Sequence, residues 1–148
     1  DQRNLPGGLS SQRGAFPMPH LIIEYTANIR AEADIAALLR KANDVIIAQD
    51  GAFPIGGIRS RAIELTDYRM ADGAADYAFV HATLKIGAGR SPEVKNRVCD
   101  ELFEAIKAHF ADLFARRYLA LSMELYEFDE GGTYKHNNVH ARFRKGPQ

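Results

Sequence analysis

The sequence is short of several features that would each mark a class of protein. Its 148 residues include a single cysteine, Cys99, so no disulfide can form within the chain, which fits a reducing cytoplasm. No apolar run is long enough to cross a bilayer. Nineteen basic side chains balance nineteen acidic ones, so the chain lacks the charge expected of a nucleic-acid-binding protein. We therefore expect a cytoplasmic protein that binds neither nucleic acid nor membrane.

Signals for cofactors and metals are also weak. Gly87 and Gly89 precede a predicted helix, but the third glycine of a dinucleotide fingerprint and the Lys-Ser/Thr pair of a P-loop are missing. Among the five histidines only His136 and His140 have a spacing that metal ligands use, and no cysteine joins them. The sequence therefore predicts an activity without organic cofactor or metal, and Cys99 as a packed helix thiol rather than a nucleophile.

Residues 1–17 differ in character from the rest of the chain. They are rich in glycine and proline, and they lack both a periodic apolar pattern and the apolar stretch of a secretory signal. A tag, a start assigned too far upstream or a genuine tail could each produce them. We favour the second origin, because Met18 precedes Pro19 and an initiator methionine before a small residue is ordinarily removed. We interpret residues 1–18 as a disordered leader and residues 19–148 as one folded domain.

The rest of the chain shows a strand, a helix and a strand, written twice with an offset of about 60 residues. Ser91 is a suitable N-cap for the second helix, with Pro92 at its first position. The apolar spacing predicts strands over 20–26, 58–66, 77–86 and 119–128, and helices from about 35 to 46 and from 92 to about 116.

Two βαβ repeats, 19–68 and 75–130, predict an α+β fold with a four-stranded sheet and two helices on one face. The other face needs a cover, and its mixed side chains suit burial against another subunit, so we expect a homo-oligomer. Residues 131–148 form a C-terminal arm that either lies on a neighbouring subunit or frays.

Several separated motifs carry a family resemblance. Residues 89–95 (GRSPEVK), which lead into a helix, resemble the start of the helix in 4-oxalocrotonate tautomerase. Residues 70–91 and 135–143 (KHNNVHARF) resemble the double-length members of the same superfamily, the 5-carboxymethyl-2-hydroxymuconate Δ-isomerases. The chain is thus identified as a member of the tautomerase superfamily, and the resemblance implies a homotrimer of two fused βαβ units that needs no cofactor.

The resemblance also implies a catalytic base, the amine of an N-terminal proline, and Pro19 is the proline that follows a methionine. A free α-amino group titrates at roughly 7.7 to 8.0, and burial or nearby arginines lower that pKa toward the working pH. A proline at the start of a strand usually has no chemical role, so the prediction depends on the other motifs.

The family's two arginines fall at Arg59 and Arg90. Fixed guanidinium groups bind carboxylates and stabilise a dienolate, although most arginines are solvated surface charges. Arg61, which faces the same side as Arg59, and Arg30 are weaker candidates. Because only the first repeat can present a free amine, we predict one site per chain, formed by Pro19, Arg59 and Arg90.

The predicted activity is isomerisation of an unsaturated 2-hydroxy di- or tricarboxylate, such as 5-carboxymethyl-2-hydroxymuconate from aromatic catabolism. This assignment is what the resemblance implies. Two alternatives stay open: a decarboxylase or dehalogenase on the same fold, and a non-catalytic trimer that binds a dicarboxylate through Arg59 and Arg90.

Overall fold

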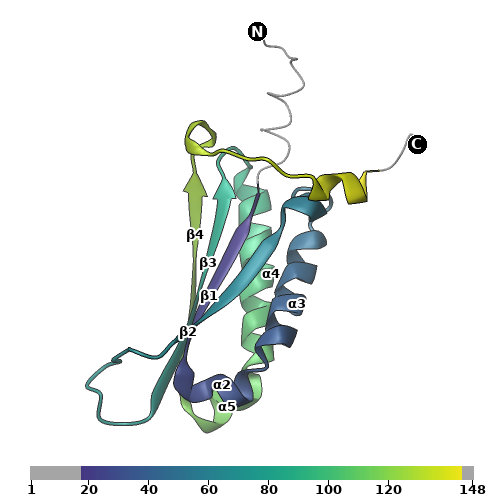
Figure 1. Cartoon of the computed structure of the whole chain (residues 1–148). Helices are drawn as coiled ribbons and strands as arrows, with labels where there is room; N and C mark the ends of the chain where they lie inside the picture. Colours follow the sequence, from purple (N-terminus) through teal and green to yellow (C-terminus); the bar gives the residue numbers. More distant parts are fainter. Residues whose placement is uncertain (1–17, 145–148) are drawn as a thin grey trace.

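A computed structural model of the protein describes residues 18–144 and arranges them around one four-stranded sheet (Figure 1). The leader predicted over residues 1–18 therefore lies outside the described residues, apart from Met18. The strands are β1 (His20–Thr26), β2 (Arg59–Leu65), β3 (Tyr77–Gly87) and β4 (Tyr118–Phe128), in the sheet order β2-β1-β3-β4.

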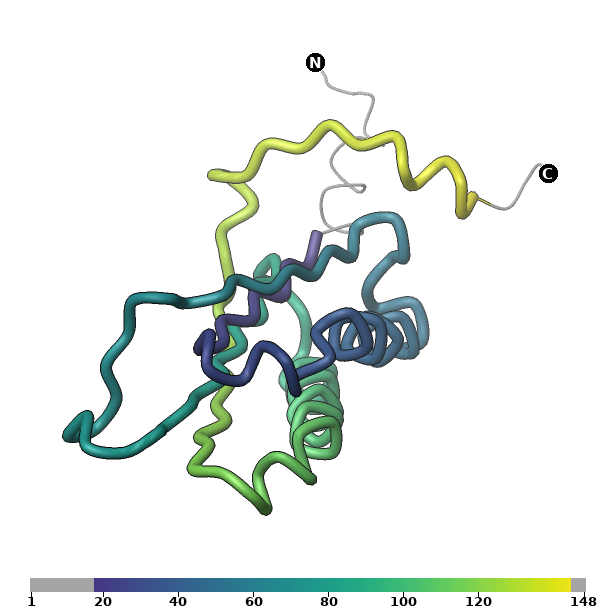
Figure 2. Tube along the Cα trace, turned by 60° about the horizontal axis from the view of Figure 1, so that its bottom comes forward, coloured from purple at the N-terminus to yellow at the C-terminus, as the bar shows by residue number. Residues whose placement is uncertain are grey.

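Two long helices lie on the same side of this sheet (Figures 1 and 2). The α-helices are α2 (Arg30–Ala33), α3 (Ile35–Ile47), α4 (Pro92–His109) and α5 (Ala111–Arg116), and the 3-10 segments are η1 (Ala27–Ile29), η2 (Ile55–Gly57), η3 (Glu130–Gly132) and η4 (Val139–Phe143). Over residues 18–144, none of the helices has the length and apolar character that crossing a membrane requires.

The strand pairing confirms the predicted fold class. β1 pairs in parallel with β2 and β3 pairs in parallel with β4, so each pair is connected through one long helix. The two βαβ units join where β1 runs antiparallel to β3. The division into repeats 19–68 and 75–130 and an arm 131–148 stays a prediction.

The two faces of the sheet differ in burial. On β3 the alternate side chains that face the helices are each 1% exposed or less, from Ala78 to Ile86, and they form the core with α3 and α4. The opposite side of the sheet, called here the open face, carries a mixture of apolar, aromatic and charged side chains. From β1 and β2 it carries His20, Ile22, Glu24, Arg59, Arg61 and Ile63, and from β3 and β4 Tyr77, Phe79, His81, Thr83, Lys85, Tyr118, Ala120, Ser122, Glu124 and Tyr126.

One predicted helix differs from the structure. The helix expected to run from Pro92 to about Arg116 ends at His109, and the short α5 follows after Phe110. Phe110 and Leu113 are both buried, so the apolar spacing continues across the break and does not reveal it in the sequence. The predicted N-cap is confirmed, since the Ser91 hydroxyl accepts a hydrogen bond from the Val94 amide at 3.3 Å.

Candidate active site

At one end of the sheet, three segments that are distant in the sequence lie side by side. His20, the first residue of β1, lies opposite Arg59 on β2 and Lys85 on β3, so the starts of β1 and β2 meet the end of β3. Pro19 is buried at this end of the sheet, and its carbonyl oxygen accepts a hydrogen bond from the Arg59 amide at 3.2 Å. The predicted base and the first predicted arginine are therefore neighbours.

Met18, which is bonded to the Pro19 nitrogen, is buried next to Arg59. Its side chain is only 7% exposed, and its sulfur Sδ lies 3.2 Å from Nη2 of Arg59. The amide nitrogen Nδ2 of Asn137 lies 3.5 Å from the same sulfur. Two hydrogen-bond donors from distant segments thus converge on the residue that is bonded to the proline nitrogen.

Positive side chains gather at this end of the sheet, although the whole chain has no net charge. Nδ1 of His20 accepts a hydrogen bond from Arg61 at 3.1 Å. Burial lowers the pKa of His20 below 6.5, and the positive charges of Arg59, Arg61 and Lys85 lower this pKa further. A neutral histidine among three cations leaves this part of the surface suited to an anionic ligand.

Arg90 follows the end of β3, and three of its N–H groups donate to backbone carbonyls. Nε and Nη2 donate to the Ala52 carbonyl at 3.2 and 2.8 Å, and Nη1 donates to the Gly87 carbonyl at 3.4 Å. The guanidinium carbon also lies 4.1 Å from the centre of the Phe53 ring, and burial lowers the pKa of Arg90. Two of its five N–H groups thus bind the Ala52 carbonyl and a third binds the Gly87 carbonyl, which leaves two for a ligand.

The C-terminal arm contributes residues for which the sequence analysis predicted no role. Nδ2 of Asn137 donates to the Gly56 carbonyl at 3.1 Å, and Oδ1 accepts from the Val139 amide at 2.6 Å. A Cβ placed on Gly56 would come within 2.7 Å of the His140 Cα, so the arm lies directly on η2 (Figure 1). The available signal was the motif over 135–143, to which Asn137 and His140 belong.

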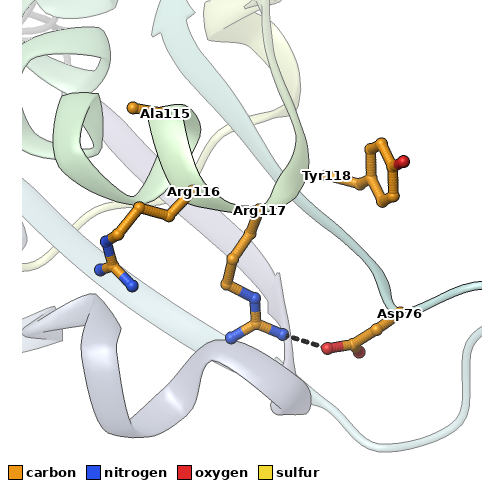
Figure 3. A pocket seen from close by; sticks show the side chains of 5 residues that line it. All are labelled: Asp76, Ala115, Arg116, Arg117 and Tyr118. Atoms are coloured by element: carbon orange, nitrogen blue, oxygen red, sulfur yellow. Dashed lines mark hydrogen bonds and ion pairs between the residues drawn. The ribbon is translucent and has the colours of Figure 1, made fainter.

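A surface hollow of about 480 Å³ lies at the opposite end of the sheet, where β3 and β4 begin (Figure 3). Its lining includes Arg117, which is paired with Asp76 at 2.7 Å and also with Glu32. Arg116 forms an ion pair with Asp112 at 3.0 Å. Because carboxylates of the chain already neutralise both arginines, this hollow is poorly suited to an anionic substrate, and we do not assign the site to it. It is lined by Asp76, Ala115, Arg116, Arg117 and Tyr118.

Cys99 has surroundings that oppose a nucleophilic role. The thiol is half-buried on α4 and packs against the core. Burial raises the pKa of Cys99, and the charge of Asp100 raises it further. The thiolate is therefore disfavoured near neutral pH.

Comparison with known proteins supports the double βαβ fold and assigns its class. A crystal structure of a 5-carboxymethyl-2-hydroxymuconate isomerase from Deinococcus radiodurans R1 superposes with a TM-score of 0.84 at 52% identity, over 87% of this chain and 96% of that one. A second crystal structure, of a 5-carboxymethyl-2-hydroxymuconate delta-isomerase, gives a TM-score of 0.81 at 32% identity, over 88% and 96% of the two chains. The protein is an isomerase with the tautomerase fold.

The sequence comparisons define the particular family. The family model for 5-carboxymethyl-2-hydroxymuconate isomerase matches residues 19–143. The 5-carboxymethyl-2-hydroxymuconate Delta-isomerase of Escherichia coli is 51% identical over 127 residues, which are 86% of this chain and all of that protein. The chain belongs to the 5-carboxymethyl-2-hydroxymuconate isomerase family, and the resemblance inferred from its motifs is confirmed.

Proposed function

We propose that the protein moves a carbon–carbon double bond in an unsaturated 2-hydroxy di- or tricarboxylate by transferring a proton. 5-Carboxymethyl-2-hydroxymuconate, the substrate named for the Escherichia coli relative, is the compound of this class that we propose, within the catabolism of aromatic compounds. The reaction breaks an O–H or allylic C–H bond and forms a new C–H bond. In the product, the carbon–carbon double bond is conjugated with a 2-oxo group. Atoms and electrons balance without an oxidant, a reductant or a cofactor.

The observation that carries this proposal is the position of Pro19. It is buried at the head of β1, it contacts Arg59, and the family match begins at this residue. In a chain that starts there, its secondary amine is free and can take a proton and return it to carbon. Burial and the positive charges of Arg59 and Arg61 disfavour the protonated amine, which favours its role as a base.

The two arginines have different tasks in this proposal. Arg59 holds the end of the substrate beside the amine, because its Nη2 already points to the space that Met18 occupies. Arg90 binds a carboxylate through the two N–H groups that Ala52 and Gly87 leave. Both guanidinium groups would stabilise the dienolate that forms when the proton leaves.

We further propose that the working form is a cytoplasmic homotrimer in which the open face is buried between subunits. Ile63 and Tyr126 on this face are 44% and 56% exposed in the single chain. Exposed apolar side chains on a sheet face without helices favour association with another subunit.

The experiment uses the chain with a free Pro19 amine, produced by starting translation at Met18 and verified by mass spectrometry. Ultraviolet absorbance should show isomerisation of 5-carboxymethyl-2-hydroxymuconate. Arg59→Ala should lower kcat/KM on the order of 10²-fold or more, since it removes a charged donor from the transition state.

The matched control is Arg30→Ala, because Arg30 is an exposed arginine paired with Glu64 and should leave kcat/KM nearly unchanged. Release of carbon dioxide from this substrate, or of halide from a halogenated unsaturated acid assayed separately, would identify one of the other chemistries of the fold. Binding of a dicarboxylate without any turnover would identify a binding protein.

A further inference from the structure

We propose that Asn137, on the C-terminal arm, is a further catalytic residue that donates a hydrogen bond to the anionic head of the substrate beside Arg59. This inference rests on the proposed function, because it needs Met18 to be absent from the working enzyme. It assigns a chemical task to the arm.

The position of Met18 marks where the substrate must lie. A proton taken by the Pro19 amine has to come from a molecule next to that nitrogen, and Met18 is the residue bonded to it. Its sulfur, a weak acceptor, lies 3.2 Å from Nη2 of Arg59 and 3.5 Å from Nδ2 of Asn137. When Met18 is removed, both donors lose this contact and can bind a ligand that lies next to the free amine.

The Asn137 amide is held in this orientation by backbone. Its Oδ1 accepts from the Val139 amide, and one N–H of Nδ2 donates to the Gly56 carbonyl. These two bonds fix which end of the amide is the donor, and the second N–H of Nδ2 is directed toward Met18. A donor that is already oriented costs little reorganisation when negative charge develops next to it.

A neutral hydrogen-bond donor can stabilise the dienolate without weakening the base. Every added cation stabilises the dienolate, but it also lowers the pKa of the amine and weakens the base. Arg59, Arg61 and Lys85 already supply positive charge around His20. An amide N–H stabilises an oxyanion without adding a full charge, so Asn137 complements Arg59. The ligand atoms are oxygens of the 2-hydroxy acid head, the group that carries negative charge in the dienolate.

The test compares Asn137→Ala with Asn138→Ala in the chain that has a free Pro19 amine. Asn138 is the adjacent residue of the same type, and its side chain is exposed. We expect Asn137→Ala to lower kcat/KM on the order of 10²-fold, mainly through kcat, while Asn138→Ala stays within about twofold of the parent. Circular dichroism and thermal unfolding verify that both variants are folded.

A double variant separates substrate contact from arm docking. If Asn137 and Arg59 act on the same head group, the loss in Arg59→Ala/Asn137→Ala should be smaller than the product of the single losses. Parental kcat/KM in Asn137→Ala, or losses that multiply fully in the double variant, would overturn this proposal. An inactive parent with a free amine would instead overturn the proposed function, so the two failures are distinguishable.

Discussion

The guanidinium of Arg90 stacks on the Phe53 ring, with its central carbon 4.1 Å from the ring centre, while two of its nitrogens donate to the Ala52 carbonyl. The residue before the α4 N-cap thus fixes the loop that leads from α3 to η2. Since η2 contacts the arm that carries Asn137, Arg90 also stabilises the segment on which the arm lies.

Substitution of Arg90 should therefore reduce stability as well as substrate binding. Arg90→Ala removes all the hydrogen bonds to Ala52 and should lower the free energy of unfolding by about 1 to 3 kcal/mol. Arg90→Lys keeps the charge but lacks the planar fork, so it should recover only part of this loss. Denaturant unfolding measures both variants. Unchanged stability with a raised KM would show that Arg90 acts on the substrate alone.

A single added methyl group on η2 should displace the arm. In Gly56→Ala the new Cβ would lie 2.7 Å from the His140 Cα and 2.8 Å from its amide nitrogen, and backbone atoms cannot rotate away. We expect a loss of kcat/KM comparable to that of Asn137→Ala, on the order of 10²-fold. A displaced arm moves the Asn137 amide away from the substrate.

The matched control for this variant is Gly132→Ala. Nothing lies within 4 Å of a Cβ built on Gly132, which lies near the start of the same arm. Its activity should equal that of the parent. Full activity in Gly56→Ala would contradict a role of the docked arm in catalysis.

Much of the fold could be predicted from the sequence, because it depends on local patterns. Alternating apolar residues on β3 and the cap formed by Ser91 and Pro92 are readable without a structure, and two such βαβ units admit few arrangements. The adjacency of Pro19 and Arg59 follows from parallel pairing of β1 with β2.

The remaining features depend on contacts between distant segments. The guanidinium of Arg90 and the carbonyl of Ala52 are 38 residues apart in the sequence, and Asn137 is 119 residues from Met18. No periodicity encodes such pairs. The motif over 135–143 contributed only to the family resemblance, and the role proposed for Asn137 required the position of the Met18 sulfur.

The surroundings of His20 predict a pH dependence of stability. Burial and neighbouring cations lower its pKa in the folded chain below the ordinary value of 6.5. Between pH 7 and 5 the unfolded chain therefore binds a proton that the folded chain resists, so this group makes stability fall as the pH falls. His20→Gln should flatten this part of the curve.

The pH dependence is measured by denaturant unfolding at several pH values. His136→Gln, which removes an exposed histidine of the arm, is the control and should leave the slope unchanged. An identical slope in His20→Gln and the parent would contradict the assignment to His20.

The open face should determine the oligomeric state. Ile63→Glu places a charge on this face, which we propose to be buried between subunits, and should shift the protein from trimer toward monomer in sedimentation velocity. Ile47→Glu is the matched control, because Ile47 ends α3 on the other side of the sheet and is similarly exposed, at 37%. A trimer that persists in Ile63→Glu would place the interface elsewhere.

The central claim is that the Pro19 amine is the base, and the most direct measurement compares two versions of the same chain. One begins at residue 1, so the Pro19 nitrogen is an amide without useful basicity, and the other begins at Pro19. We predict isomerisation of 5-carboxymethyl-2-hydroxymuconate by the second version, with kcat reduced at least on the order of 10²-fold in the first, after mass spectrometry has verified both termini. Equal activity of the two versions would contradict the account, because the base would then lie elsewhere.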